Sequence, residues 1–291
     1  MMQGREKSDL AIVAAKPANN DGQPSAEPVE RRAGAEGNAG QDRTCRAQDR
    51  ESVSQGLDRV RHVAKSRKTE RFTTLLHHVT PDLLRTAFFA LRRSAAPGVD
   101  GLTWQTYEAD LDRRIEDLHE RVHLAIAALE DKIVQRAAAT VLNAIYEEDF
   151  LGFSYGFRPG RGAHDALDAL AVGITRTKVS HILDADIRSF FDAVSQKWLL
   201  RFLNHRIGDP RILRLIRKWL NAGVLEDGAV SVGETGTGQG SVISPLLANV
   251  YLHHVFDLWA ERWRRREARG DMMIVRYVDD SAPRRREEGV M

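Results

Sequence analysis

The sequence predicts an α+β fold, in which helices pack around a small antiparallel sheet. Several stretches repeat apolar residues every three or four positions, as amphipathic helices do. Apolar runs on either side of Asp227-Gly228 are typical of an antiparallel hairpin. Two further apolar runs, 179–187 and 272–278, have the length of strands, and aspartates lie within or directly after them. Hairpin pairing with helices in separate runs favours α+β over a doubly wound α/β fold.

Composition limits the function classes. Apolar residues make up 42% of the 291-residue chain, which is enough for a sizeable core. The formal net charge is only +2, so affinity for nucleic acid would have to come from local clusters. A single cysteine, Cys45, excludes an intramolecular disulfide and a cysteine-based metal site. Without an apolar signal region or an uninterrupted apolar span, the sequence predicts a cytoplasmic protein that does not enter a membrane.

The N-terminal half is expected to consist of a leader and a helical region. Residues 1–66 are rich in Gly, Pro, Asn, Gln, Glu and Arg, and we expect them to be a disordered leader. From 67 to 178 the apolar periodicity predicts helices, which we expect from Pro81, over 103–123, over 130–146 and over 164–172. A loop rich in Gly and Pro, 152–161, separates the last two helices.

The C-terminal half is expected to contain the strands. We expect a buried strand over 179–187 and a second strand over 272–278, followed by a polar tail from Ser281. Asp209 as the N-cap, Pro210 at the first helical position and Gly223 after the end define a helix between the two strands. A long helix is predicted to begin at Ser244 and to continue to about residue 269.

The aspartates on the two strands suggest a metal site. Asp184 and Asp186 alternate along one strand and so share a face, while Asp279 and Asp280 follow the other strand at a turn. Either motif alone is more often a solvated turn or a cap. If the strands are neighbours, however, the carboxylates meet and suit hard divalent cations. Two magnesium ions about 4 Å apart activate an attacking hydroxyl and stabilise a leaving pyrophosphate, so the pattern indicates in-line phosphoryl transfer.

Three runs, in this order, resemble consecutive blocks of reverse transcriptases: 184–192 (DADIRSFFD), 236–249 (GTGQGSVISPLLAN) and 277–280 (YVDD). The runs 97–101 (PGVDG) and 155–161 (YGFRPGR) resemble blocks of bacterial group II intron-encoded reverse transcriptase/maturases rather than retroviral enzymes. The resemblance covers about 71–280. It implies a right-hand polymerase with a fingers-like helical region at 67–178 and a partial palm at 179–280, whose small antiparallel sheet is flanked by helices.

The resemblance also implies roles for individual residues. The ligands of two Mg²⁺ ions would be the side chains of Asp186, Asp279 and Asp280 and the backbone carbonyl of Ile187. Phe191 would exclude a ribose 2′-hydroxyl, and Gln239 and Gly240 would lie beneath the incoming nucleotide. Contacts with nucleic acid are implied for Arg158 and Arg161, which would hold template phosphates, and for Tyr277.

The sequence departs from the family pattern in two places. The family has a basic fingers segment after the helix that ends near His123, whereas here His123 is followed directly by the apolar run 124–127. After Asp280 the family continues with an apolar strand, a primer-gripping element, a thumb and a maturase domain. Here 281–291 is a short polar tail unlike the family, so we expect the thumb and maturase domains to be absent and the palm hairpin to leave an unpaired edge.

The expected function is that of an RNA-directed DNA polymerase of a mobile group II intron, crippled in this chain. Its partners would be an intron RNA template, a DNA primer and deoxynucleoside triphosphates, and the sequence leaves the oligomeric state open. One alternative is a non-catalytic fragment that binds intron RNA through Arg158, Arg161 and Arg264 to Arg266. Another palm-type enzyme, such as a cyclase, is less consistent with the Gln239 loop and with the tyrosine before Asp279.

Overall fold

The computed structural model of the chain describes residues 39–94, 101–122, 128–176, 179–221, 224–226, 229–231, 235–237, 241–268, 272–278 and 280–285. Gly40–Met291 form one compact unit. Among the described residues, no helix is long and apolar enough to cross a membrane.

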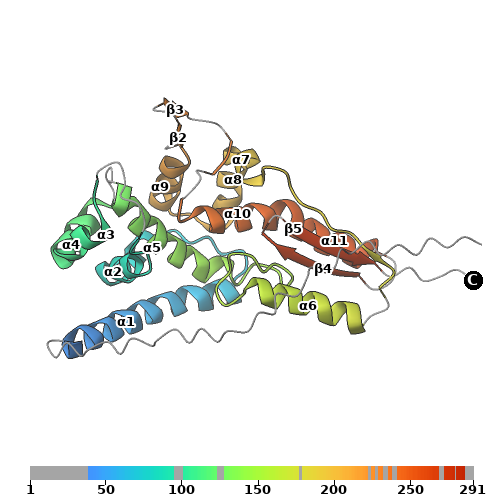
Figure 1. The fold of residues 1–291 in the computed structure, drawn as a ribbon, viewed down its shortest axis with the longest axis horizontal. Coiled ribbons are helices and arrows are strands. Elements are labelled where there is room, and N and C mark those ends of the chain that lie inside the picture. Colours follow the sequence, from blue (N-terminus) through green and yellow to red (C-terminus); the bar gives the residue numbers. More distant parts are fainter. Residues whose placement is uncertain are drawn as a thin grey trace, which may run out of the picture. The chain divides into compact units, whose positions relative to one another are not determined.

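Most of the described chain is helical (Figure 1). The α-helices are α1 (Ala39–Ser66), α2 (Pro81–Phe89), α3 (Trp104–Glu108), α4 (Leu111–Arg121), α5 (Ala128–Tyr146), α6 (Ala163–Arg176), α7 (Phe190–Ala193), α8 (Gln196–Arg206), α9 (Pro210–Leu220), α10 (Ser244–Leu252) and α11 (Leu258–Arg266). A 3₁₀ turn, η1 (Leu76–His78), precedes α2, and a π-helix, η2 (His253–Asp257), joins α10 to α11.

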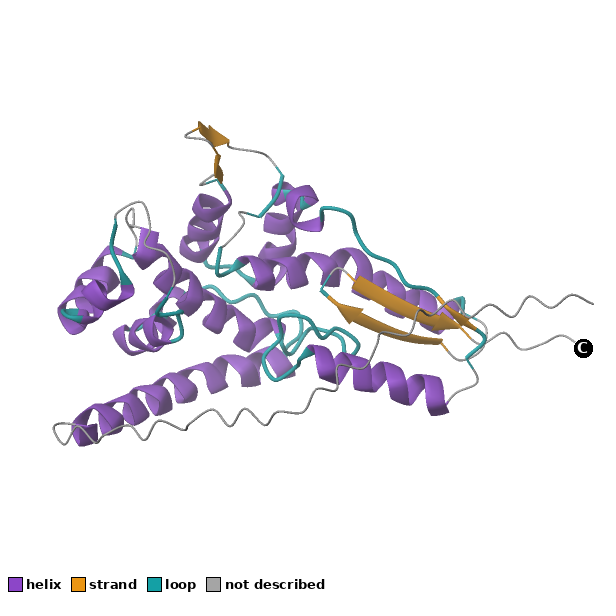
Figure 2. Cartoon of the chain, in the orientation of Figure 1, coloured by secondary structure: helices purple, strands orange, loops and turns teal. Residues whose placement is uncertain are grey.

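The strands form two antiparallel sheets (Figure 2). The larger sheet has the order β1-β5-β4, with β1 (His181–Ile182), β4 (Met272–Tyr277) and β5 (Asp280–Arg285). Helix α6 lies against β4. The smaller sheet is the hairpin of β2 (Val224–Glu226) and β3 (Ala229–Ser231). These helices and antiparallel pairings agree with the expected α+β class.

Helix α5 is the centre of the hydrophobic core. Its apolar positions recur at helical intervals and are fully buried, among them Ile133, Val134, Ala137, Val141, Leu142 and Ile145. Helix α2, whose Leu84 and Phe88 are fully buried, packs on α5, and α10 contacts α5 as well. Apolar residues thus surround α5 on several faces, which makes it the scaffold on which the loop after it, 151–162, is placed.

Several predicted elements are confirmed. The helix from Pro81, the helix up to Tyr146 and the long helix from Ser244 are present, although the last contains the π-helix. Asp209 N-caps α9, with its side chain accepting from the Arg211 N–H, and Pro210 is the first helical residue. Strands β2 and β3 pair with Glu226 opposite Ala229, as a hairpin around Asp227-Gly228 requires. Gly223 and the two turn residues lie outside the described residues.

The expectation of one helix over 103–123 is wrong, because the segment forms α3 and α4. The chain leaves helical geometry at Asp110, the N-cap of α4, where φ is −133°. Aspartate favours such a position since its short polar side chain competes with the helical backbone. The helix predicted over 164–172 is present but longer, and it forms α6.

The expectation of a disordered leader is wrong for 39–66, which form α1. Leu57, Val60 and Ala64 lie on one face of this helix and are buried in the core. Their spacing is helical, but they lie in a stretch so charged that its composition resembles that of a disordered segment. Packing against the rest of the chain, rather than intrinsic propensity, stabilises such a helix. Residues 1–38 lie outside the described residues.

Two expectations about the sheet are also wrong. The segment 179–187 is not a buried strand: regular pairing is limited to β1, and Ile182 and Leu183 are more than half exposed, since burial needs a covering element as well as apolar composition. The tail from Ser281 does not leave the hairpin unpaired, because 281–285 belong to β5, the middle strand. Backbone pairing does not depend on apolar side chains, so a polar segment supplies this strand.

Candidate active site

The structure describes the proposed metal ligands only in part. Asp186 lies four residues after β1, and both it and Ile187 are exposed. Asp280 begins β5, directly across from Tyr277 of β4, but its side chain is not described. Asp279 lies outside the described residues. Among the side chains that are described, no group of three or more His, Cys, Asp or Glu could hold a metal ion, and the convergence of the three aspartates stays a prediction.

The expected nucleotide gate, Phe191, is in contact with another of the motifs. Its half-buried ring meets Phe190 at 5.4 Å and Phe157 at 6.5 Å between ring centroids. Its carbonyl accepts a hydrogen bond of 2.9 Å from the Thr237 N–H. Gly236 has φ +91°, a conformation that favours glycine, and passes close to the same segment. The structure therefore brings together runs 184–192 and 236–249, while Gln239 and Gly240 lie outside the described residues.

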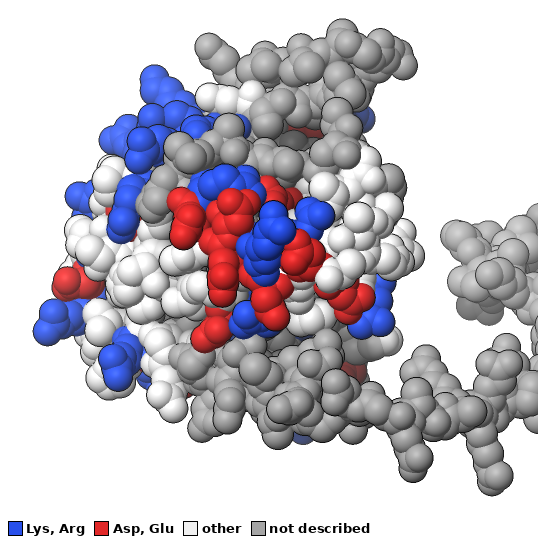
Figure 3. Space-filling view, turned by 90° about the vertical axis from the view of Figure 1, so that its left-hand side faces the viewer, with Lys and Arg blue, Asp and Glu red and all other residues white. Residues whose placement is uncertain are grey.

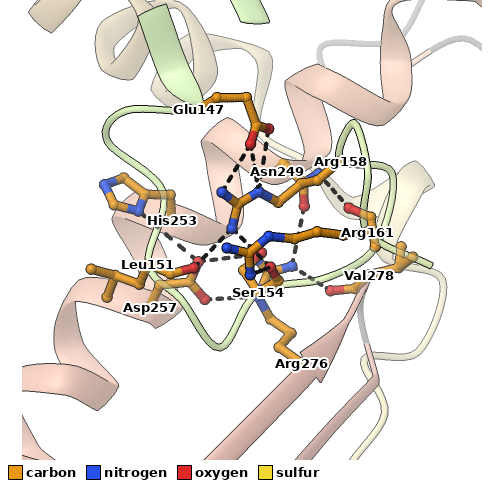
Figure 4. Close-up of polar contacts among 11 residues, drawn as sticks. Glu147, Leu151, Ser154, Arg158, Arg161, Asn249, His253, Asp257, Arg276 and Val278 are labelled. Atoms are coloured by element: carbon orange, nitrogen blue, oxygen red, sulfur yellow. Dashed lines mark hydrogen bonds and ion pairs between the residues drawn. The ribbon is translucent and has the colours of Figure 1, made fainter. Parts of the chain in front are cut away.

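Arg158 occupies a different place from the one expected. Its side chain is only 3% exposed and forms an ion pair with Glu147 at 2.9 Å. Its Nη1 donates to the carbonyls of Leu151 and Ser154, both at 2.8 Å (Figure 4). A guanidinium held in this way would have to break these bonds to reach a phosphate. In this structure Arg158 holds the loop 151–162, and its expected contact with template phosphates stays a prediction.

Arg161 is more accessible than Arg158. Its Nη1 donates to the Gly152 carbonyl at 2.6 Å, and its guanidinium lies 5.4 Å from the centroid of the Tyr155 ring. Tyr277 is also partly exposed, at the end of β4. Contacts of Arg161 and Tyr277 with nucleic acid stay predictions.

Arg276, which the sequence analysis did not predict as a site residue, is the centre of a buried hydrogen-bond network next to Val278 (Figure 4). Its side chain is 1% exposed and faces Asp257, whose side chain is fully buried, with Nε–Oδ1 and Nη2–Oδ2 distances of 2.7 and 2.8 Å. Nη2 also donates to the Ser154 hydroxyl at 2.6 Å, and Nη1 donates to the Val278 carbonyl at 2.6 Å. One guanidinium thus connects η2, the loop after α5 and the residue before Asp279.

Burial shapes the ionisation of this network. It raises the pKa of Asp257, although the charge and hydrogen bonds of Arg276 act in the opposite direction. Burial, together with the positive charges of Arg276 and Arg158, lowers the pKa of His253 to about 4. His253 is therefore neutral at pH 7, and the network depends on carboxylate–guanidinium pairs.

An ion pair joins α4 to α5 next to His123, the residue after which the sequence lacks the basic fingers segment of the family. The Arg121 guanidinium forms ion pairs with Asp117 at 2.6 Å and with Glu130 at 3.0 Å. In Figure 3, acidic side chains gather at the centre of this face, with basic ones among and around them. The described part of this face therefore does not present a uniformly cationic surface.

Comparisons with known proteins agree with the motifs. The family model described as "Reverse transcriptase (RNA-dependent DNA polymerase)" matches residues 117–282. The chain is 36% identical over 170 residues to Protein YkfC of Escherichia coli, covering 57% of this chain and 44% of that protein. It is 37% identical over 132 residues to the group II intron-encoded protein LtrA of Lactococcus lactis, covering 45% of this chain and 22% of LtrA.

A protein encoded in a cob intron of Schizosaccharomyces pombe is 41% identical over 132 residues, which cover 45% of this chain and 16% of that protein. The chain thus spans less than half the length of these relatives. A chain of a partial Cas6-RT-Cas1–Cas2 complex aligns with 75% of this chain, at a TM-score of 0.44 and 23% identity, and the alignment covers 39% of that chain.

Proposed function

The chain belongs to the reverse transcriptase (RNA-dependent DNA polymerase) family, in its group II intron-encoded branch, and from that premise we propose that its chemistry is RNA-templated DNA synthesis at Asp186, Asp279 and Asp280. In this proposal 67–178 are fingers-like, 179–280 are part of the palm, and the sheet β1-β5-β4 is the palm sheet. The substrates are deoxynucleoside triphosphates, an intron RNA template and a DNA primer.

The strand order is the observation that carries this proposal. Strand β5 lies between β1 and β4, and β1 pairs with it so that Ile182 faces Arg284. If this register continued beyond β1, residue 186 would lie opposite Asp280. Residues opposite each other on antiparallel strands have Cβ atoms roughly 5 Å apart, close enough for their carboxylates to share metal ions. Asp279 precedes Asp280 in the chain.

The donors fit magnesium, because carboxylate oxygens are the ligands that this hard cation prefers. Asp186, Asp279, Asp280 and the Ile187 carbonyl would hold two ions, which supply the activation of the primer hydroxyl and the neutralisation of the leaving pyrophosphate. Phe191 would form the wall beside the sugar, where its ring is fixed by Phe190 and Phe157. The protein itself mainly positions the reactants.

We expect this activity to be low. The connection between α4 and α5, 122–127, contains no Lys or Arg, and the nearby Arg121 is already paired with Asp117 and Glu130. Positive groups that would neutralise the triphosphate at this place are therefore missing. Loss of one well-placed charge contact costs on the order of a hundredfold in rate.

Primer extension on an RNA template with Mg²⁺ and deoxynucleotides tests both parts of the proposal. We expect trace extension by the purified chain, and none by Asp186→Asn or Asp279→Asn. Extension that is unchanged in Asp279→Asn would contradict the catalytic assignment. Robust extension that requires Asp279 would instead contradict the proposed loss of activity.

RNA binding without catalysis is a second candidate, favoured by exposed tryptophans and arginines on two helices: Trp198 and Arg201 on α8, and Trp259 and Arg262 on α11. The guanidinium of Arg201 lies 4.9 Å from the Trp198 ring centroid, and the exposed ring of Trp259 is stacked on Trp263. Exposed aromatic rings interleaved with arginines are typical of platforms for single-stranded nucleic acid. Of the residues expected for this role, Arg158 is buried, and Arg264 and Arg265 both pair with Glu261.

Under this second candidate, Trp259→Ala should weaken binding of single-stranded RNA roughly tenfold, because loss of one base–aromatic stack costs about 1–3 kcal/mol. Fluorescence anisotropy with a labelled RNA measures the affinity, which should also fall as salt rises. Leu167 is a matched control, since Leu167 and Trp259 are both 57% exposed and Leu167 lies on α6. Equal affinities of Trp259→Ala and Leu167→Ala would exclude a role of Trp259 in RNA binding.

A further inference from the structure

Arg276 and Gly156 both lie against Val278, the residue before Asp279. We infer from this geometry that Arg276 and Gly156 are positioning residues for the metal ligands. They fix the backbone of Val278, the residue that precedes Asp279 in the chain. This inference rests on the proposed metal site. It assigns the loop 151–162, which the sequence suggested as a grip for template phosphates, to a second task inside the protein.

Arg276 acts on the turn through a direct hydrogen bond. Its Nη1 donates to the Val278 carbonyl, which belongs to the peptide group that links Val278 to Asp279. The guanidinium cannot easily shift, because the Asp257 carboxylate grips it from one side and the Ser154 hydroxyl accepts from it on another. Figure 4 shows Arg276 between Asp257 and Val278. A planar fork with several fixed partners orients the peptide more rigidly than a single ammonium would.

Val278 adopts a conformation that needs such support. Its φ is +60°, in the left-handed region, which is costly for a β-branched residue. Strained residues of this kind persist only where the surroundings over-determine them, and they concentrate at functional sites. Here the surroundings are the bond from Arg276 and the burial of the Val278 side chain.

Gly156 approaches the same residue from the loop. A Cβ atom at Gly156 would clash with the Val278 nitrogen and lie 3.0 Å from the Val278 Cα, so a side chain there would displace the backbone of Val278. The loop is held at this distance by two further contacts. Asn249 donates to the Gly156 carbonyl at 2.7 Å, and the Arg276 carbonyl accepts from the Tyr155 N–H at 2.9 Å.

These contacts place the motif 155–161 directly against the motif 277–280. The loop therefore sets the position of Val278, and a methyl group at Gly156 would displace the backbone of this residue. Groups that orient metal ligands from behind typically change metal affinity by about 10- to 100-fold when they are altered. A purely structural contact would change stability and leave the affinity of the folded chain unaltered.

Binding of Mn²⁺ to the full chain, followed by electron paramagnetic resonance, separates these possibilities, with thermal unfolding measured in parallel. We expect Gly156→Ala to weaken Mn²⁺ binding by about tenfold or more. The matched control is Gly152→Ala, in the same loop, where an added Cβ meets no atom within 4 Å. Arg276→Lys is a second variant, which keeps the positive charge beside Asp257 but loses the fork, and it should also weaken binding.

Three results would be decisive. Tighter Mn²⁺ binding by the wild type and Gly152→Ala than by Gly156→Ala and Arg276→Lys, with all four chains folded, supports the inference. Equal affinity in all folded variants, together with loss of binding in Asp186→Asn and Asp279→Asn, would overturn the inference and leave the proposed function intact. If the wild-type chain binds no Mn²⁺, or binds it equally well without these aspartates, the proposed metal site fails and the inference fails with it.

Discussion

Replacing Asp257 by alanine is expected to lower the free energy of unfolding by about 3–5 kcal/mol, because the Arg276 guanidinium would stay buried without its counter-ion. Asp257 is fully buried and accepts two of the hydrogen bonds of Arg276, at 2.7 and 2.8 Å. The remaining acceptors, such as the Val278 carbonyl, are neutral and do not compensate a full positive charge. Urea unfolding followed by tryptophan fluorescence measures the loss.

Two controls separate burial from pairing. The ion pair of Arg61 and Asp58 is as short, at 2.6 Å, but both side chains are at least half exposed, so Asp58→Ala should cost about 0.5 kcal/mol or less. The double variant Asp257→Leu/Arg276→Met removes both charges and should recover most of the stability, since apolar pairs replace buried ion pairs well. A loss below about 1 kcal/mol in Asp257→Ala would show that water or another group compensates Arg276.

Asp209→Ala is expected to cost about 2–4 kcal/mol, because one buried carboxylate serves two elements. It caps α9 by accepting from the Arg211 N–H at 2.9 Å. It also accepts from the N–H groups of Leu75 and Leu76, at 2.8 and 3.1 Å, which otherwise have no acceptor at the start of η1. Asp209→Asn should cost less, since the amide oxygen still accepts one or two of these bonds.

Because of Asp209, we also expect the free energy of unfolding to depend on pH. Burial alone would raise the pKa of Asp209, but hydrogen bonds from the side chain of Arg211 and from the backbone of Leu76, Arg211 and Leu75 lower it to about 2. Because the folded pKa is below the unfolded value of about 3.9, this contribution is complete above about pH 5 and disappears as the pH falls towards 2. Unfolding of the wild type and Asp209→Asn between pH 5 and 2 should therefore converge at the acidic end.

The elements predicted correctly are those with local signals. The cap at Asp209, the hairpin around residues 227–228 and the periodicity of α5 each depend on neighbours in the sequence, and each is found in the structure. Helix α8 was not predicted, although Ser195 is an N-cap and Leu199 and Leu203 are spaced four apart and buried. This cap and this spacing are local signals of a helix of the same kind as those of α9.

The network behind the candidate site could not be predicted in the same way, because its members are far apart in the chain. The burial of Arg276 is explained only by its partner Asp257, which lies 19 residues earlier in the chain, on the π-helix η2. One signal was present: Arg276 shares a face of β4 with Ile274, and it lies between Val275 on the same strand and Val278 just after it, which are both buried. An arginine between two buried apolar residues predicts an acidic partner inside the protein.

The helix formed by α10, η2 and α11 must keep its number of residues, because the π-helix η2 sets how α11 is rotated relative to α10. The Leu258 N–H donates to the His253 carbonyl, five residues back, so this turn accommodates one residue more than an α-helical turn does. Each residue of an α-helix advances the side chains by about 100°, and the extra residue therefore rotates all of α11 relative to α10 by about that angle. This phase is what lets Asp257 face inwards to Arg276 while Leu258 and Trp259 face outwards. A surface loop would absorb the insertion or deletion of a single residue. In the middle of this helix, the same change would turn Asp257 away from Arg276, which lies 19 residues later in the chain, and would break their ion pair.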